Sequence, residues 1–269
     1  MEKYQIFLPF VLNTLRYFLF AGIAYFVFYV WQRQAMFHRK IQQKYPDWKE
    51  NRRDILYSIS SAIIFGTLGL GVFWAKKQGY TQLYMDIAEF GVPYLIFSIA
   101  MLIFVHDTYF YWTHRLMHHP KLFPIFHKVH HQSHNPSPWT SFAFHPLEAI
   151  VEAAFLPILV FIMPIHPLAS FLFLLYSIVM NVLGHTGFEY HGKNMLKHKL
   201  FKWLNTPTHH NMHHQYSRGN FGLYFNIWDK LMKTNDKNYE KRYDEIQERI
   251  ENTEHSYELT KNINLPLSK

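Results

Sequence analysis

The stretch VPYLIFSIAMLIFVHDTYFYWTHRLMHH, residues 92–119, decides the fold class of this chain. Its first part, residues 92–110, is predominantly apolar and close to the roughly 20 residues that a membrane-crossing helix requires. Its last part carries His114 and His118, which are four residues apart and therefore lie on one face of a helix. This stretch predicts a membrane helix that ends in a polar site.

Three more apolar stretches have comparable length, at residues 8–30, 54–75 and 147–186. The last is broken at Pro164 and Pro167 and is expected to form a hairpin of two helices. The composition agrees, since 49% of the residues are hydrophobic and only 17% are charged, against roughly 25% in soluble domains. We therefore predict an all-α, polytopic helical membrane protein with about four to five membrane-embedded helices.

The distribution of lysine and arginine predicts the orientation of these helices. The loop at 31–53 is rich in both residues, whereas the loop at 76–91 contains only Lys76 and Lys77. The positive-inside rule places the first loop in the cytoplasm, and helix parity then places every histidine motif there, as a helical cap. The net charge of +8 is attributed mainly to the lysines and arginines that set the membrane orientation, so no nucleic-acid partner is expected. Arg16, within the first apolar stretch, is expected to snorkel outward.

Histidine is the unusual residue of this chain. Of 19 histidines, 17 lie between His106 and His214. Two motifs, HKVHH and HNMHH, repeat one spacing (i, i+3, i+4) and are expected to place three imidazoles on one helical face: His127, His130 and His131, then His210, His213 and His214. Imidazole binds iron, zinc, copper and nickel. With His114 and His118 the total is eight, more than one ion can use, so two metal ions are predicted.

Other strings accompany these motifs: DTYFYWTHRLMHH, FPIFHKVHH, SFAFHPLE, NVLGHTGFE, TPTHHNMHH and NFGLYFNIWDKLMKT. Together they resemble the sterol desaturase and fatty acid hydroxylase superfamily over about residues 92–234. The resemblance implies an integral membrane, O2-dependent oxidoreductase with two non-haem iron ions, which hydroxylates or desaturates a C–H bond of a lipid in lipid biosynthesis. One departure is the closing string, which is usually WDRLFGT and here is WDKLMKT.

The resemblance also implies a set of metal ligands. Carried over by position, they are His114, His118, His127, His130, His131, His185, His210, His213 and His214. The tenth position is open, because relatives with a second HX3H box have a histidine where this chain has Glu189. Glu189, His191, His145 and a water molecule all remain candidates for it, and His145 is also a candidate for supporting a ligand without binding metal itself.

Further residues are expected around the ligands. Asp107 is predicted to accept a hydrogen bond from the second ring nitrogen of a ligating histidine, and Glu148 is a weaker candidate for the same role. Four other histidines are expected to support the ligands or to lie at the surface: His106, His119, His134 and His209. The aromatic residues Tyr109, Phe110, Trp112, Trp139, Phe142 and Phe144 are interpreted as an interfacial belt, with the lining of a lipid tunnel as the alternative.

The chain contains no cysteine, which excludes disulfides, iron–sulfur clusters, zinc–thiolate sites and thiol nucleophiles. We see no segment to hold haem or flavin, so electrons must come from a separate donor protein, and zinc is expected to replace iron on purification. The main alternative function is a histidine-rich membrane protein that binds or transports metal. A zinc hydrolase is disfavoured because the HExxH signature is absent.

Three regions are expected. Residues 1–91 form the N-terminal membrane helices and basic loop, residues 92–234 form the hydroxylase-like catalytic domain, and residues 235–269 form a charged cytoplasmic tail. In that tail Tyr243, Ile246 and Ile250 follow a helical spacing, which predicts a soluble amphipathic helix. The protein is expected in the inner membrane if it is bacterial and in the endoplasmic reticulum if it is eukaryotic, surrounded by membrane lipids and with its substrate drawn from them.

Overall fold

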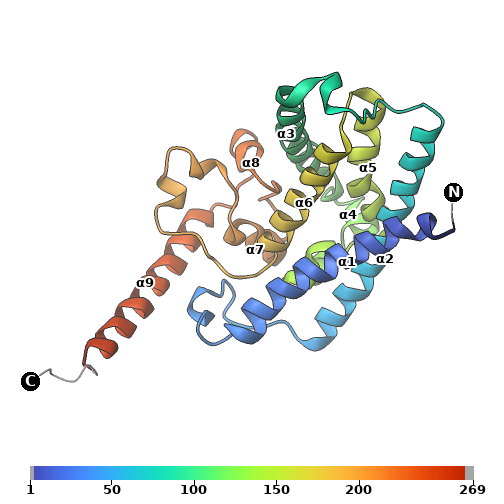
Figure 1. Cartoon of the computed structure of the whole chain (residues 1–269). Coiled ribbons are helices and arrows are strands. Elements are labelled where there is room, and N and C mark those ends of the chain that lie inside the picture. The colour runs from blue at the N-terminus through green and yellow to red at the C-terminus, as the bar shows by residue number, and fades with distance from the viewer. Residues whose placement is uncertain (1–2, 264–269) are drawn as a thin grey trace, which may run out of the picture.

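The computed structural model describes residues 3–263, which form helices and no β-strand (Figure 1). The long helices are α1 (Lys3–Tyr25), α2 (Trp48–Lys77), α3 (Gly91–Met117), α5 (Pro146–Ile162), α6 (Pro167–Gly184) and α9 (Tyr239–Ile263). The short ones are α4 (Phe123–Phe126), α7 (Pro207–Tyr216) and α8 (Ile227–Leu231). Single turns are η1 (Phe26–Trp31), η2 (Phe37–Arg39), η3 (Ile87–Glu89), η4 (His130–Gln132), η5 (Pro138–Phe142), η6 (Met195–Lys197) and η7 (Phe201–Trp203). The predicted all-α fold is confirmed.

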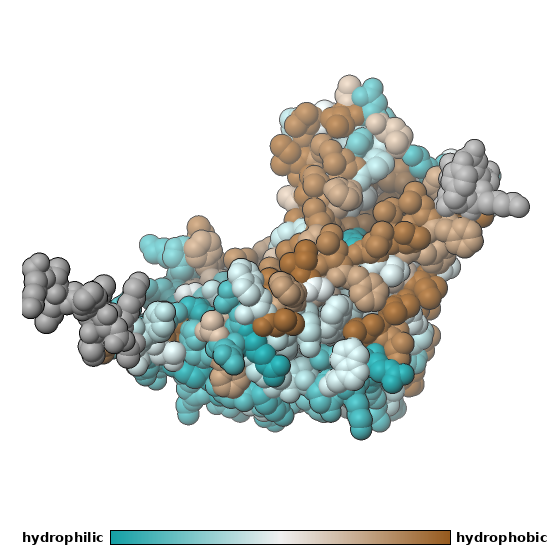
Figure 2. Space-filling model, turned by 60° about the horizontal axis from the view of Figure 1, so that its bottom comes forward, coloured by the Kyte–Doolittle hydropathy of each residue, from teal (hydrophilic) through white to brown (hydrophobic). Residues whose placement is uncertain are grey.

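Four helices are long and apolar enough to cross a membrane: Ile6–Trp31, α2, α3 and α6. They expose many large apolar side chains, among them Leu12, Leu15, Leu19, Ile63, Ile96, Phe97, Phe104 and Phe171. In the view of Figure 2, hydrophobic residues gather over one part of the molecular surface and hydrophilic residues cover much of the rest. A contiguous apolar surface of this kind suits a lipid environment.

Helices α5 and α6 form the hairpin that the prolines predicted. Helix α5 has 17 residues and ends at Ile162, and α6 begins with Pro167 at its first position. Proline is favoured there because the first helical N–H has no partner within the helix. The His166 side chain caps α6 by accepting a hydrogen bond from the N–H of Leu168 at 3.0 Å. Pro167 and the His166 cap therefore define where the second helix of the hairpin begins.

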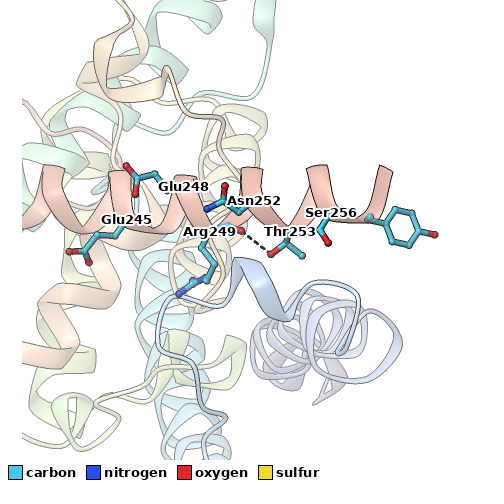
Figure 3. A pocket seen from close by; sticks show the side chains of 7 residues that line it. Glu245, Glu248, Arg249, Asn252, Thr253 and Ser256 are labelled. Carbon is cyan, nitrogen blue, oxygen red and sulfur yellow. Dashed lines mark hydrogen bonds between the residues drawn. The ribbon is translucent and has the colours of Figure 1, made fainter. Parts of the chain in front are cut away.

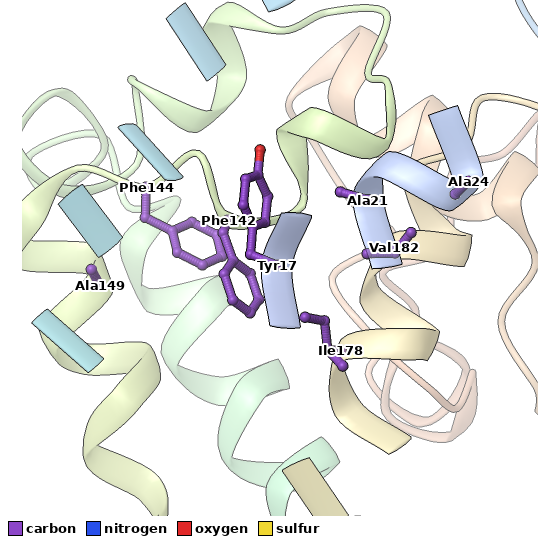
Figure 4. Packing of buried hydrophobic residues seen from close by; sticks show 8 residues of the cluster. All are labelled: Tyr17, Ala21, Ala24, Phe142, Phe144, Ala149, Ile178 and Val182. Atoms are coloured by element: carbon purple, nitrogen blue, oxygen red, sulfur yellow. The ribbon is translucent and has the colours of Figure 1, made fainter. Parts of the chain in front are cut away.

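The N-terminal helices hold the loop between the second histidine motif and α5. Tyr17 on α1 donates a hydrogen bond to the carbonyl of Trp139 at 2.9 Å, and its ring stacks on Phe142 at 5.6 Å between centroids (Figure 4). Helix α1 also packs closely on α2 at Gly66, where a Cβ would lie 2.6 Å from the ring of Phe10. These contacts fix the chain that enters α5.

Helix α9 is the predicted amphipathic helix, and its first half is docked. Tyr243, Ile246 and Ile250 are buried, with the two isoleucines against Ile41 of the basic loop. Arg249 donates hydrogen bonds to the carbonyl oxygens of His38 and Lys40 at 2.7 and 2.6 Å. The second half projects away from the rest of the molecule (Figure 1). The charged tail thus supports the 37–41 segment.

Candidate metal centre

The structure brings nine histidines together in two groups. The five-histidine cluster contains His114, His118, His127, His131 and His213, and the four-histidine cluster contains His130, His185, His210 and His214. Within each cluster the nitrogen atoms available for a metal all lie within 4.8 Å of one another. All nine are residues that the sequence indicated as ligands.

Different elements supply each cluster. Helix α3 ends at Met117 and brings His114 and His118, while His185 follows the last residue of α6. Helix α7 brings His210, His213 and His214, and it begins with Thr206, whose side chain accepts a hydrogen bond from the N–H of His209. The membrane helices α3 and α6 therefore both end at the metal centre.

The prediction that each histidine trio faces one way is wrong. His127 and His131 belong to the five-histidine cluster but His130 to the other, and His213 is likewise separated from its two partners. Residues four apart point in nearly the same direction on a helix, whereas neighbours point about 100° apart. The second motif is also not a regular helix, because α4 ends at Phe126 and a separate turn begins at His130. Each trio consequently bridges both clusters.

Hydrogen bonds fix the protonation of several rings. The Nδ1 atoms of His114, His185, His213 and His214 donate to the carbonyl oxygens of Phe221, Asn181, Gly219 and Ser133, at 2.7–3.0 Å. His127 donates through Nδ1 to the Glu148 carboxylate at 2.6 Å. A neutral imidazole that donates through one nitrogen carries a lone pair on the other. The Nε2 atoms of these five rings are therefore free to bind a metal.

The Nε2 lone pairs face one another in both clusters. His114 and His127 bring these atoms to 2.9 Å in one cluster, and His185 and His214 bring them to 3.2 Å in the other. Two lone pairs at this distance repel unless a cation lies between them. Two nitrogens that bind one ion with bonds of about 2.0–2.1 Å are separated by about 3–3.4 Å. The donors therefore fit one metal ion in each cluster.

Burial keeps these imidazoles neutral. Desolvation, followed by repulsion from neighbouring histidines, holds the pKa of His130, His210 and His214 well below the ordinary value of 6.5. Burial also lowers the pKa of His185 to about 4. Because only a neutral imidazole donates its lone pair to a metal, the clusters are ready for metal at neutral pH.

An apolar cavity of about 440 Å³ lies between α1, α2, α3, α5 and α6. Two phenylalanines in its wall reach the metal centre: Phe110 packs against His114 with ring centroids 4.9 Å apart, and Phe144 against His130 at 5.2 Å. Phe142 lines the cavity too, so the interfacial-belt interpretation is wrong for these three residues. Trp112, in contrast, is exposed and packs against Trp228. The cavity thus contacts both clusters.

A model of the fatty acid hydroxylase family matches residues 99–234, which contain both clusters. The chain belongs to this family. Delta(7)-sterol 5(6)-desaturase ERG3B of Gibberella zeae is 32% identical over 72% of this chain and 60% of its own length. Human lathosterol oxidase is 30% identical over 70% and 62%, and the Delta(7)-sterol 5(6)-desaturase erg32 of Schizosaccharomyces pombe is 30% identical over 82% and 63%.

The chain spans less than two thirds of the length of these three relatives. No solved structure matches it. The match of the fatty acid hydroxylase family confirms the resemblance drawn from the histidine motifs.

In this member of the fatty acid hydroxylase family, none of the three candidate residues for the tenth ligand (Glu189, His191 and His145) lies in either cluster. Glu189 is buried, and its carboxylate accepts hydrogen bonds from Nδ1 of His191 at 2.9 Å and from the Thr208 hydroxyl at 2.7 Å. It misses the cluster because α6 ends at Gly184 and the chain then turns at Gly187, with φ of +73°. His145 caps α5 instead.

The prediction for Asp107 is also wrong. Its carboxylate accepts hydrogen bonds from the backbone N–H groups of Tyr224 and Phe225, at 2.7 and 3.2 Å, and not from an imidazole. Buried backbone N–H groups need an acceptor, and the Asp107 carboxylate supplies one to the N–H groups of Tyr224 and Phe225. Glu148, on the first turn of α5, occupies the expected position beside His127.

The remaining histidines lie outside the clusters. His119 and His134 are exposed, and His209 is buried with its Nε2 at 3.1 Å from Oδ1 of Asn235. His106 lines the cavity. Arg16 does too, so the expectation that it snorkels outward is wrong: its Nη2 donates to Asn13 at 2.9 Å, and this face of α1 is turned towards α2 and α6.

The sequence reasoning missed Asp229, which orders the loop over the five-histidine cluster. Its carboxylate accepts hydrogen bonds from the N–H groups of Phe221 and Gly222 at 3.0 and 2.6 Å. The carbonyl oxygens of Phe221 and Gly219 in this loop hold His114 and His213. The signal was the WD pair of the closing family string, together with the glycines before it: Gly219 has φ of +65°, and a Cβ there would lie 2.4 Å from a backbone oxygen.

A surface hollow along α9 is not part of this site. Its lining side chains come from one helix, as Figure 3 shows, and include Glu245, Glu248 and Arg249 but no histidine. Arg249 already binds backbone carbonyls of the basic loop. This hollow therefore contributes no residue to either histidine cluster.

Proposed function

We propose that the chain is a membrane-bound, non-haem diiron oxidoreductase that uses O2 to hydroxylate or desaturate a C–H bond of a lipid. The observation that carries this proposal is the contact of one apolar cavity with both histidine clusters, through Phe110 and Phe144. The named relatives, which are sterol desaturases and lathosterol oxidase, support a lipid substrate and oxidation chemistry.

The nine histidines would hold two iron ions, and iron when bound supplies the activation of O2. The chain's own residues do the rest. Glu148 accepts a hydrogen bond from the Nδ1–H group of His127. This bond keeps the Nε2 atom of His127 directed into the five-histidine cluster. Phe110 and Phe144 form an apolar wall between the cavity and the imidazoles, which excludes water from a lipid chain lying there.

The cofactors and partners of this reaction come from outside the chain. O2 and the lipid enter from the membrane, and electrons come from a separate donor protein that docks on the polar cap. We place this cap on the cytoplasmic face, because the basic loop at 31–53 packs with it through Ile41 and α9. The protein would reside in the bacterial inner membrane or in the endoplasmic reticulum.

The orientation has its own test. Cysteines at Lys44 and Lys237 are expected to resist a membrane-impermeant thiol reagent in intact cells, whereas one at Gln78 reacts. All three side chains are exposed in the structure, so accessibility depends on the side of the membrane alone, and the chain has no native cysteine to interfere. Labelling at Lys237 without labelling at Lys44 would contradict the proposed topology.

The structure favours oxidation over the alternative of metal transport. A transporter binds its ion in a polar path near the middle of the membrane and must release it. Here the rings are buried at the ends of α3 and α6, and the space beside them is an apolar cavity. Backbone carbonyls also hold four of the rings in place, which suits a resident ion.

The proposed function is tested by comparing the lipids of cells that express the wild type, His131→Ala or His134→Ala. Mass analysis should show a lipid that has gained one oxygen or lost two hydrogens in the wild type. His131→Ala should abolish it, whereas His134→Ala, an exposed histidine outside both clusters, should retain it. Identical lipids in all three strains would refute the proposal.

A further inference from the structure

Two polar side chains in the wall of the apolar cavity have no partner. His106 on α3 is 6% exposed, and its Nδ1 is buried without a hydrogen bond. Glu152 on α5 lines the same cavity and forms no hydrogen bond or ion pair with any residue that the structure describes. A buried polar group without a partner costs about 1–3 kcal/mol, and most such groups in proteins are satisfied. A buried imidazole nitrogen without a partner, and a half-buried carboxyl without one in the same cavity, indicate a ligand that supplies the missing bonds.

The surroundings of His106 hold its ring in place. It lies edge-on to Phe155 and Phe173, with centroids 4.8 and 5.1 Å apart, and 5.6 Å from Tyr224. Tyr224 is fully buried behind it, and its hydroxyl also has no partner. The imidazole is therefore fixed by apolar contacts alone, and its polar atoms remain available to the cavity.

This polar pair lies on the membrane side of the metal centre. His106 precedes His114 by eight residues on α3, which is about 12 Å along the helix axis. Glu152 follows Glu148, the partner of His127, by one helical turn on α5. Both helices thus carry one residue at the metal centre and one deeper in the cavity.

We propose that His106 and Glu152 bind a neutral hydroxyl group of the lipid substrate, an inference that rests on the proposed oxidation of a lipid. A hydroxyl both donates and accepts, so it can donate to a carboxyl oxygen of Glu152 and accept from the imidazole N–H. A carboxylate or phosphate group is disfavoured at this position because burial raises the pKa of Glu152 to about 8, so its largely protonated carboxyl offers no positive charge to pair with an anion. The carbon that reacts is then about 12 Å away from the hydroxyl, near Phe110 and Phe144.

Arg16 is the competing polar group of the cavity. Its Nε is buried without a partner, and a guanidinium would favour an anionic lipid head group. However, its Nη2 is already engaged by Asn13, and it makes no hydrogen bond to Glu152. An anionic lipid held by Arg16 is therefore the outcome against which the hydroxyl site is tested.

The test measures equilibrium binding of labelled lipids to the metal-loaded full chain in detergent micelles. The probes are two pairs that differ by one hydroxyl, cholesterol with cholest-5-ene and hexadecan-1-ol with hexadecane, together with palmitate. We expect at least one pair to show a preference for the hydroxylated lipid of at least about fivefold, since one hydrogen bond is worth about that much and the site supplies two. His106→Phe and Glu152→Leu should each lower this preference without changing the affinity for the lipid that lacks the hydroxyl.

Two further variants keep the result interpretable. Glu152→Gln retains the shape and an acceptor oxygen, and should keep part of the preference. Ser170→Ala removes a hydroxyl elsewhere in the cavity wall and should keep all of it. Metal content equal to that of the wild type shows that each variant is folded.

Three results would overturn the proposal: no hydroxyl preference in either pair, a preference that survives in both His106→Phe and Glu152→Leu, or tightest binding of palmitate that is lost in Arg16→Gln. Binding is measured without turnover. A chain that prefers the hydroxylated lipid but oxidises none refutes only the proposed function, and one that oxidises lipid without this preference refutes only the hydroxyl site.

Discussion

The two histidine clusters differ in how firmly their rings are held. In the five-histidine cluster, Nδ1 of His114, His127, His131 and His213 has a hydrogen-bond partner. In the four-histidine cluster His185 and His214 are held, whereas Nδ1 of His130 and His210 is buried without a partner. Groups that hold the second nitrogen of a ligand orient it and strengthen metal binding. We therefore expect the five-histidine cluster to bind its ion more tightly.

The difference follows from where the rings originate. The five-histidine cluster lies beneath the loop at 217–222, which supplies a hydroxyl and two carbonyl oxygens, and beside Glu148. The four-histidine cluster lies between α6, α7 and the turn at His130, where the carbonyl oxygens of Asn181 and Ser133 hold two of the four rings. An ion in the four-histidine cluster would also have fewer protein ligands than one in the five-histidine cluster.

The largest expected effect separates the clusters by removing one ligand from each. His213→Ala should lower the metal occupancy of the five-histidine cluster, and His214→Ala that of the other, so the metal content of each variant should fall from two ions per chain towards one. Lipid oxidation should fall by more than about 100-fold in both, since removing even a supporting residue costs 10–100-fold. Metal analysis of purified protein measures the stoichiometry.

His213 and His214 are adjacent on α7 but belong to different clusters, so their alanine variants form a matched pair. His119→Ala is the control, because this exposed histidine lies outside both clusters. If either variant lost both ions, the clusters would form one cooperative site. If either retained two, the assignment of that histidine would be wrong.

A smaller effect is expected from Glu148→Gln. The amide can no longer hold the His127 Nδ1 proton as an anion, so metal affinity of the five-histidine cluster should fall about 10–100-fold while the four-histidine cluster keeps its ion. Competition with a chelator of known affinity measures this difference. Glu189→Gln is the matched control: it removes a buried carboxylate that binds His191 and Thr208, so metal content should stay unchanged.

As the pH falls, the two clusters should lose their metal ions at different pH values. Burial lowers the pKa of the histidines in both, to about 4 for His185, so the unfolded chain with its ordinary value of 6.5 binds more protons below neutrality. Stability and metal binding are therefore full above pH 6.5 and are lost as the pH falls towards 4. Since four ligands hold less tightly than five, the ion of the four-histidine cluster should leave first.

The two single-ion variants measure these midpoints separately. After desalting at stepwise lower pH, His213→Ala, which keeps the four-histidine ion, should lose it at the higher pH. Equal midpoints, or the reverse order, would contradict the ranking of the clusters.

The sequence predicted the membrane helices and the nine histidines because both depend on local pattern. Apolar length and two prolines defined the helices, and the spacing of the motifs with the family resemblance indicated which histidines gather. The partition between clusters was not predictable. It depends on the irregular backbone between Phe126 and His130, which a repeated spacing does not reveal.

The errors at single carboxylates have a tertiary origin. Glu189 was placed by extending α6 beyond its end, although Gly187 with its positive φ shows where the chain turns. Asp107 and Asp229 hold backbone N–H groups of the 221–225 segment, more than a hundred residues from Asp107. A carboxylate next to a histidine motif in sequence need not contact a histidine, because the partners come from distant segments.

The smallest expected effect is at Ser217, whose hydroxyl lies 3.0 Å from Nδ1 of His131. Ser217→Ala removes one neutral hydrogen bond, worth about 1 kcal/mol, so the five-histidine cluster should bind its ion about fivefold more weakly. Thr253→Ala on α9 is the control, since its hydroxyl bonds only to the Arg249 carbonyl (Figure 3). The four-histidine cluster should be unaffected in both, because Ser217 touches none of its rings. If Ser217→Ala instead lowered the metal affinity of the four-histidine cluster, the hydrogen bonds to Nδ1 would not explain the difference between the clusters.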